Sequence, residues 1–189
     1  MSTSTPEPDA ATRKGDGSAV QPGSTPDSTA SQPAALSATP AEPALRALGL
    51  EFRVVRHGRV ASLAEAARVR GVTASQIVKT LVVRRAAGDY LFVLVPGDRE
   101  ISWPKLRALL GVSRISMPDA ATAFEATGYE RGTITPFGAR TAWPVVADER
   151  IGPGEVSLGA GEHGAAIIVD AAAALSALDA QVADVTEPA

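Results

Sequence analysis

One lysine interrupts a strongly apolar stretch of the sequence. Lys79 lies within Gln76–Val83, and most of its neighbours there are β-branched residues or leucine. Because side chains alternate between the two faces of a strand, we expect Lys79 and Leu81 to point to one face and Thr80 to point to the other. Lysine is rarely buried without a partner, so a lysine on the inner side of a sheet is a candidate anion-binding or catalytic group. The alternative is an edge-strand lysine that protects the sheet against aggregation.

A glycine-rich loop at Gly132–Gly138, with the sequence GTITPFG, offers a second kind of chemistry. Its glycines let backbone N–H groups approach a ligand, and the hydroxyls of Thr133 and Thr135 can form hydrogen bonds with it. Such donors stabilise the oxyanion that forms when an ester carbonyl is attacked. Taken alone, the heptapeptide is more typical of a plain Gly/Pro turn.

A second glycine-rich segment, Gly159–Gly164, matches the pattern G-x-G-x-x-G. In dinucleotide-binding proteins a helix begins at this pattern and its N-terminus binds the pyrophosphate. Here the next residues, Ala165–Val169, have the pattern of a strand, so we exclude nicotinamide and flavin binding. His163 could act as an acid, a base or a phosphate contact, although a solvated turn histidine fits equally well. His57, beside a glycine, is also expected to be a solvated turn histidine.

The composition excludes several classes of site. The chain has no cysteine, which rules out disulfides, thiolate zinc sites and cysteine nucleophiles. Its two histidines are far apart in the sequence, so we expect no metal and no cofactor. The patterns G-x-S-x-G, the P-loop and H-E-x-x-H are all missing from the sequence.

Charge is distributed unevenly along the chain. Residues 46–114 contain 13 lysines and arginines against 5 acidic residues, whereas residues 116–189 contain 3 against 11. This asymmetry can mark a polyanion-binding face in the first half of the domain. Solvated surface arginines are the alternative interpretation.

The organisation of the chain follows from its patterning. Residues 1–43 are rich in Ser, Thr, Pro and Ala, and we expect them to be a disordered tail. One domain is expected at 44–185, followed by a short tail at 186–189. No signal peptide or membrane span is visible, so we expect a soluble, cytoplasmic protein.

Hydrophobic periodicity predicts short helices and strands. A capping-box pattern at Ser62 and Glu65 predicts a helix that ends at Gly71. The strands Ile77–Arg84 and Tyr90–Val95 should form a central hairpin. Further helices are expected at 41–48, 103–110, 118–127 and 171–178, and further strands at 52–55, 144–148, 155–159 and 165–169. This spacing favours a mixed α/β fold with a barrel-like mixed β-sheet flanked by short helices.

The ordered set of these motifs resembles the YbaK/EbsC family. The set comprises the lysine in IVKTLVV, the hairpin strand ending in VPGD, the G-x-x-x-P-F-G loop after Gly-Tyr, and the late G-x-G-x-x-G. Members are aminoacyl-tRNA deacylases related to the editing domain of bacterial prolyl-tRNA synthetase. The resemblance covers nearly all of residues 45–185.

The resemblance implies a YbaK-like fold and a set of site residues. Lys79 matches the lysine regarded as central to the family's function, and Thr135 is the second catalytic candidate. The expected substrate-binding residues are Gly132, Thr133, Ile134, Pro136, Phe137, Gly138, Gly159, Gly161, His163 and Gly164. The candidate tRNA contacts are Arg53, Arg56, Arg59, Arg68, Arg84 and Arg85, expected to form one positive stripe.

The implied reaction is hydrolysis of a mischarged aminoacyl-tRNA carrying a small amino acid, on tRNA-Pro or a related tRNA. The implied partners are aminoacyl-tRNA and, as a possibility, an aminoacyl-tRNA synthetase, with no membrane and a monomer or weak dimer. Two alternatives stay open. One is a non-catalytic tRNA- or synthetase-binding module, and the other is a small-molecule aminoacyl esterase.

Overall fold

The computed structural model describes residues 37–189, which form one compact unit. The expected tail at residues 1–43 therefore lies mostly outside the described residues. Five helices are described: α1 (Glu42–Ala47), α2 (Leu63–Arg70), α3 (Trp103–Leu110), α4 (Ala120–Thr127) and α5 (Ala171–Ala177). The described strands are β1 (Phe52–Arg56), β2 (Val78–Ala86), β3 (Asp89–Pro96), β4 (Arg99–Ile101), β5 (Val145–Asp148), β6 (Glu155–Gly159), β7 (Ala165–Asp170), β8 (Gln181–Ala183) and β9 (Thr186–Pro188).

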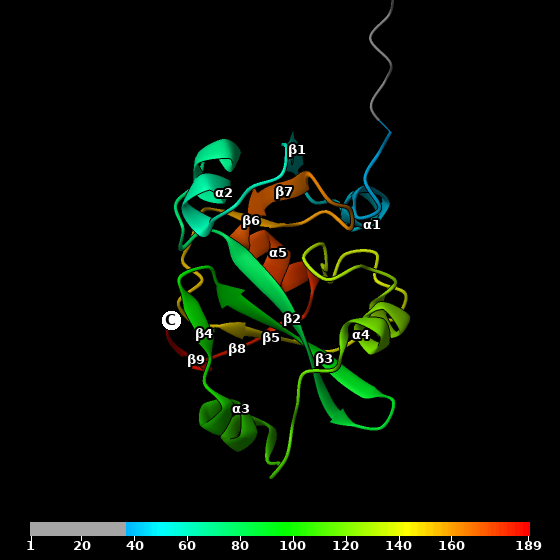
Figure 1. Cartoon of the computed structure of the whole chain (residues 1–189), viewed down its shortest axis with the longest axis vertical. Coiled ribbons are helices and arrows are strands. Elements are labelled where there is room, and N and C mark those ends of the chain that lie inside the picture. The colour runs from blue at the N-terminus through cyan, green and yellow to red at the C-terminus, as the bar shows by residue number, and fades with distance from the viewer. Residues whose placement is uncertain (1–36) are drawn as a thin grey trace, which may run out of the picture. The chain divides into compact units, whose positions relative to one another are not determined.

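The strands form three sheets, which Figure 1 shows with the short helices around them. An antiparallel sheet has the order β1-β7-β6, and a four-stranded sheet has the order β2-β3-β5-β8. In the second sheet β2 and β3 are antiparallel, whereas β5 runs parallel to both β3 and β8. The third sheet pairs β4 with β9. This is the mixed α/β architecture that the sequence predicts.

The two larger sheets meet at one corner. Ile77, just before β2, forms a parallel bridge with Ser157 of β6, and the Ser157 N–H donates to the Gln76 carbonyl at 2.8 Å. The expected hairpin of β2 and β3 is confirmed, with Lys79 opposite Val95. However, β2 is an edge strand of its sheet and not a central one. Its outer edge is bridged only at Ile77 and at Arg84, where it pairs with Ser116, so the stretch between them has no strand partner among the described residues.

Capping side chains determine where helices α2 and α4 begin. The Ser62 hydroxyl accepts the Glu65 N–H at 3.1 Å, which confirms the predicted start of α2, whereas the Glu65 carboxylate accepts the N–H of Ala61 at 2.8 Å and not that of Ser62. Helix α4 begins later than expected, at Ala120, because Asp119 caps it by accepting the Thr122 N–H at 2.8 Å.

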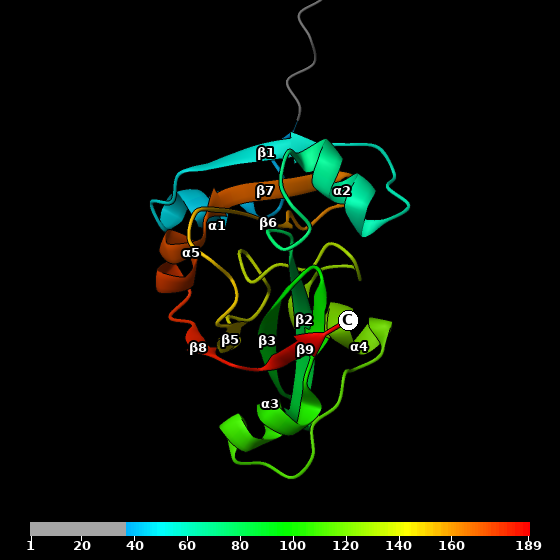
Figure 2. The same ribbon diagram turned by 90° about the vertical axis from the view of Figure 1, so that its left-hand side faces the viewer.

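The segment expected to be a tail at 186–189 instead contains β9, which pairs with β4 beside the C-terminus (Figure 2). Three short strands, β4, β8 and β9, were missed altogether, because three residues carry no period that can be recognised.

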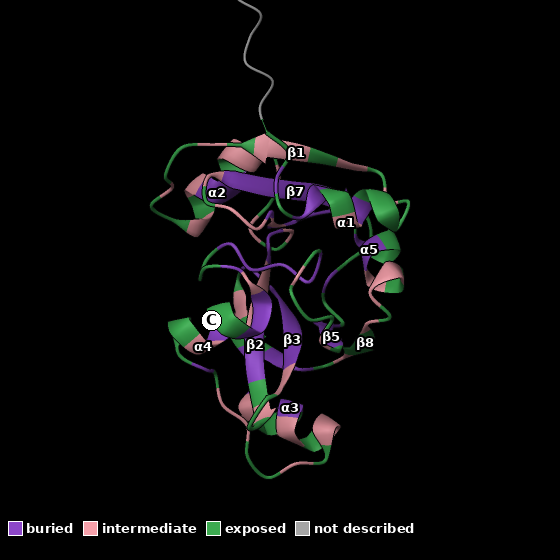
Figure 3. Cartoon of the chain, turned by 90° about the vertical axis from the view of Figure 1, so that its right-hand side faces the viewer, coloured by how far each residue is buried: buried purple, intermediate pink, exposed green. Residues whose placement is uncertain are grey.

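The core is split by the four-stranded sheet. One apolar cluster includes Val78, Val82 and Phe92 and extends to the strands of the β1-β7-β6 sheet. The other lies on the opposite face and includes Val83 and Leu106. Strands β3 and β7 are almost wholly buried, as Figure 3 shows. Because successive residues of β2 serve different clusters, the alternation expected around Lys79 is present.

The Gly132–Gly138 loop packs directly on the end of β6. A Cβ atom at Gly159 would lie 2.6 Å from the Thr133 carbonyl oxygen and 2.7 Å from that of Ile134. The Gly161 N–H also donates to the Thr133 carbonyl at 3.0 Å. Glycine is therefore required at position 159 for the loop to reach its place.

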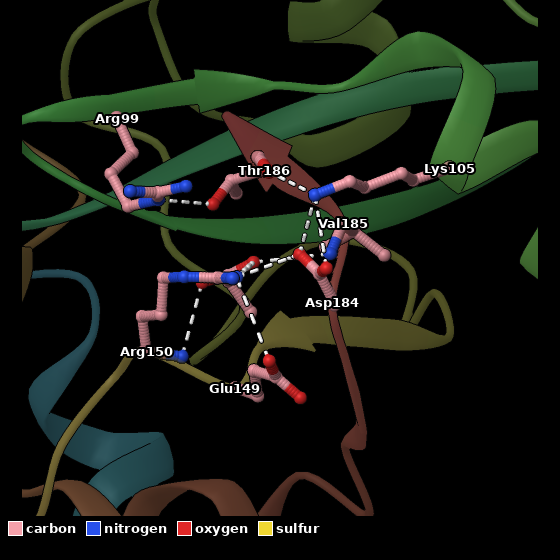
Figure 4. A network of polar contacts seen from close by, with 8 residues as sticks. Arg99, Lys105, Glu149, Arg150, Asp184, Val185 and Thr186 are labelled. Atoms are coloured by element: carbon pink, nitrogen blue, oxygen red, sulfur yellow. Dashed lines mark hydrogen bonds and ion pairs between the residues drawn. The ribbon is translucent and has the colours of Figure 1, made fainter. Parts of the chain in front are cut away.

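A buried carboxylate anchors the C-terminal segment. Asp148, which is fully buried, accepts the Arg150 N–H at 3.0 Å and the Val185 N–H at 3.1 Å. The Arg150 side chain donates to the Asp184 carboxylate, which also accepts a hydrogen bond from the Lys105 ammonium (Figure 4). The segment that leads into β9 is thus held by charged hydrogen bonds.

Replacing Asp148 with alanine should lower the free energy of unfolding by about 2–4 kcal/mol, because the buried Val185 N–H loses a charged acceptor. Chemical denaturation measures this loss. Glu149→Ala is the control, since the Glu149 side chain is exposed and its one polar contact among the described residues is a long ion pair with Arg150 at 3.7 Å. Equal stability of the two variants would contradict the anchoring role.

Replacing Gly159 with alanine should destabilise the protein by about 1–3 kcal/mol, because the added methyl collides with two backbone carbonyls that cannot move independently. Thermal unfolding measures the change. Gly152→Ala is the matched control, since a Cβ there would meet nothing within 4 Å. Two variants of equal melting temperature would show that the loop does not need this close approach.

Candidate functional site

A hollow opens beside the unpaired edge of β2. We call it the first hollow, and its cavity volume is about 370 Å³. Its walls come from the end of α2, from β2, from α4 and the residues before it, and from both glycine loops. It is lined by Arg70, Ile77, Val78, Lys79, Thr80, Leu81, Val82, Met117, Pro118, Ala123, Arg131, Gly132, Ile134 and Gly159. The lining contains three cationic residues and no carboxylate.

Lys79 belongs to this lining, but its ammonium is already engaged. It donates to the carbonyl oxygen of Gly97, in the turn after β3, at 3.0 Å and to that of Arg99, the first residue of β4. Burial lowers the pKa of Lys79, and the nearby carboxylates of Asp98 and Glu100 oppose that shift. Since an ammonium has three donors, one N–H remains for a ligand. The lysine is thus half-buried and hydrogen-bonded, unlike a solvated edge-strand lysine.

Thr80 is a lining residue that the sequence analysis did not select. Its side-chain oxygen is buried and has no hydrogen-bond partner among the described residues. A buried hydroxyl without a partner is costly, so a polar group of a ligand would stabilise it. The only signal in the sequence was a polar residue between Val78 and Val82 on the face opposite Lys79.

The structure divides the residues of the Gly132–Gly138 loop among several places. Gly132 and Ile134 line the first hollow, and the described residues offer no acceptor for their N–H groups. In contrast, Thr135 is completely buried, and its hydroxyl accepts the Phe137 N–H at 3.4 Å. The expected catalytic role of Thr135 is therefore not supported, since its side chain is used inside the loop.

The remaining residues of this loop lie away from the first hollow. The Thr133 hydroxyl is bonded to the Glu130 carbonyl at 2.9 Å. Residues Pro136, Phe137 and Gly138 line a different hollow, on the side of Trp143. Hydrogen bonding of the Tyr129 hydroxyl to the Phe137 carbonyl at 2.9 Å fixes this part of the loop. These four loop residues therefore support the shape of the loop and do not contact a ligand in the first hollow.

The late glycine segment borders a second hollow with a cavity volume of about 620 Å³. We call it the second hollow; it is lined by His57, Gly58, Arg59, Val60, Arg70, Gly132, Glu162, His163, Gly164 and Ala165. His163 is mostly exposed and pairs with Glu130 at 3.0 Å. His57 is not simply solvated as expected, because its Nε2 atom is buried and has no hydrogen-bond partner in the described part of the chain. Of the late glycines, Gly159 lines the first hollow, Gly164 the second, and Gly161 a shallow hollow next to His163.

The six arginines expected to form one stripe fall into two groups. Arg53, Arg56, Arg59 and Arg68 belong to β1, α2 and the loop between them. Arg84 and Arg85 line another hollow with Arg107 and Arg114, at the other end of β2. Three of the six are already paired with carboxylates, namely Arg53 with Glu155, Arg56 with Glu162 and Arg85 with Asp89. The two arginines nearest the first hollow, Arg70 and Arg131, were not among those selected.

Residues 37–189 contain no group of three His, Cys, Asp or Glu side chains that could hold a metal ion. Within the same range, no helix has the length and apolar character needed to cross a membrane.

Comparison with curated proteins gives several relatives. A "Proline--tRNA ligase" of Desulfotalea psychrophila is 40% identical over 80 residues, which are 42% of this chain and 14% of that protein. The "Putative Cys-tRNA(Pro)/Cys-tRNA(Cys) deacylase EbsC" of Enterococcus faecalis is 28% identical over 117 residues, or 61% of this chain and 71% of that protein. The chain thus spans about one seventh of the length of the ligase it matches.

A solved structure described as "a putative trans-editing enzyme for prolyl tRNA synthetase" superposes with a TM-score of 0.72. It is 28% identical in sequence, and the match covers 78% of this chain and 95% of that one. This confirms the expected YbaK-like fold. The family model described as "Aminoacyl-tRNA editing domain" matches residues 57–176, which include both glycine loops and Lys79. The chain therefore belongs to the aminoacyl-tRNA editing domain family, the YbaK/EbsC-type deacylases related to the editing domain of prolyl-tRNA synthetase.

Proposed function

We propose that this protein hydrolyses the ester bond of mischarged aminoacyl-tRNA in trans, with the aminoacyl group bound in the first hollow. The observation that carries the proposal is the composition of that hollow. It joins a family lysine, two loop amides without acceptors and an unpartnered buried hydroxyl in a cavity of about 370 Å³. These are the groups needed to position an ester and to stabilise the charge that develops on its carbonyl oxygen.

The chemistry needs no protein nucleophile. Water attacks the carbonyl carbon, the bond from that carbon to the ribose oxygen breaks, and the ribose oxygen takes up the proton that water releases. The N–H groups of Gly132 and Ile134 are the proposed donors to the oxyanion. Lys79 donates to one carbonyl in the turn after β3 and to one in β4, and has one donor left for the ribose or a phosphate. The neighbouring ribose hydroxyl of the substrate helps to orient the water.

The apolar lining of the first hollow fits a small amino acid. Apolar side chains on the face that carries Thr80, such as Val78 and Val82, limit the space, and Ile134 and Ala123 close it from the loop and from α4. Alanine, serine, threonine and cysteine fit this description. The similarity to prolyl-tRNA ligases and to EbsC favours tRNA-Pro or a related tRNA as the carrier.

Two other functions would use the same surface differently. A non-catalytic tRNA- or synthetase-binding module would bind tRNA without turnover. An esterase for small aminoacyl compounds would hydrolyse free amino-acid esters as fast as charged tRNA. The embedded lysine and the free loop amides favour the editing reaction, because a binding module does not need a site for an oxyanion.

Purified protein should release one or more small amino acids from a panel of tRNA-Pro charged with alanine, serine, threonine or cysteine, and should leave prolyl-tRNA-Pro intact. Loss of radiolabelled amino acid from the tRNA measures the reaction. The methyl ester of the same amino acid should react much more slowly. Salt-sensitive tRNA binding without hydrolysis would contradict the proposal and support the binding module.

Replacing Lys79 with methionine should reduce the rate of deacylation by about a hundredfold or more, since removal of one positioned donor at such a site has effects of this size. The matched control is Lys105→Met. Lys105 also donates to a backbone carbonyl, that of Thr186 at 3.0 Å, but it does not line the first hollow. Normal turnover by a folded Lys79→Met variant would remove the lysine from the mechanism.

A further inference from the structure

Arg70 is the one residue, besides Gly132, that lines both the first and the second hollow. It is the last residue of α2, directly before the Gly71 cap, and its side chain is partly buried. Its Nη1 atom donates to the buried Ser157 hydroxyl at a long 3.3 Å. Its Nε atom is buried and has no partner within residues 37–189. The guanidinium thus sits where the two hollows meet, with most of its donors unused.

The charge of Arg70 is not balanced by the residues around it. Among the described residues it forms no ion pair, and the lining of the first hollow contains no carboxylate. The only carboxylate of the second hollow, that of Glu162, is bound to Arg56 at 2.6 Å. Burial of the guanidinium lowers the pKa of Arg70. A partly buried guanidinium of this kind gains most from an incoming anion.

Other groups at the second hollow suit a nucleotide. Arg59 is exposed there and forms no ion pair among the described residues, and the buried Nε2 atom of His57 has no partner. The second hollow is also the larger of the two. An aminoacyl group in the first hollow is joined through its ester to the terminal ribose, so the adjoining phosphate must lie near the junction.

We infer that Arg70 binds the phosphate of the terminal nucleotide of the tRNA, with the aminoacyl ester on one side of it and the nucleoside in the second hollow. The inference rests on the proposed function and adds the residue that fixes the position of the substrate along the two hollows. A guanidinium matches phosphate oxygens with two parallel hydrogen bonds. Arg70 would act as a positioning residue, since it holds the substrate at a point remote from the carbonyl carbon.

The experiment uses two nucleoside probes and needs no catalysis. Binding of adenosine 5′-monophosphate and of adenosine to the full chain is measured by NMR titration. The wild type should bind the phosphorylated probe about tenfold or more tightly, a ratio expected for charge-assisted hydrogen bonds. Arg70→Gln should lose this preference, whereas Arg140→Gln should keep it. Arg140 is a matched control because it also donates to one neutral oxygen, the Glu125 carbonyl at 2.8 Å, but is exposed and lines neither hollow.

The outcomes separate this inference from the proposed function. Equal binding of the two probes by the wild type, or an unchanged preference in Arg70→Gln, would overturn the role of Arg70. The comparison of probes on the wild type can overturn the inference even if the variant fails to fold. In the deacylation assay, Arg70→Gln should raise KM for charged tRNA about tenfold and change kcat little. A wild type that prefers the phosphorylated probe but hydrolyses no charged tRNA would contradict the proposed function and leave the phosphate site standing.

Discussion

The close backbone contacts of β6 with the start of β2 and with the Gly132–Gly138 loop determine where the site forms. On one side Ser157 joins the strand to the residues before β2, and on the other Gly159 lets the Gly132–Gly138 loop lie against its backbone. The first hollow is the space left between these contacts. Because the outer edge of β2 is bridged only near its two ends within residues 37–189, the middle of that edge stays open beside the loop. The cavity thus depends on backbone packing more than on the side chains that line it.

Within the described range, the cations of the site are not neutralised by carboxylates, whereas several exposed arginines are. Carboxylates bind several of the exposed arginines, such as Arg53 and Arg56, but none lines the first hollow. Lys79 is held by neutral carbonyls, and Arg70 by a neutral hydroxyl. A cation satisfied in this way keeps its attraction for an anionic substrate, whereas a cation in a salt bridge must first give up its partner. The chain carries a net charge of −3, yet its site is electropositive.

Much of the fold could be predicted from the sequence, because caps, turns and alternation are local signals. The capping box at Ser62, the hairpin after β2 and the strand pattern at Ala165–Val169 all have such causes. The strands β4 and β9 could not be predicted, since each exists only through pairing with the other. In the site, Lys79 was apparent as a charge within an apolar run. Arg70 and Thr80 were not, because their importance comes from missing partners, and a sequence does not show which partners are missing.

The pairing of β4 with β9 links the site to the latest-synthesised part of the described chain. Arg99 of β4 supplies a carbonyl to Lys79 and its side chain binds the Thr186 hydroxyl, across a separation of 87 residues. During translation, β4 cannot form its strand pairing until β9 has been synthesised. Contacts of such long range form slowly. A nascent chain can therefore build most of its sheets before the second acceptor of Lys79, the Arg99 carbonyl, is held in its final place.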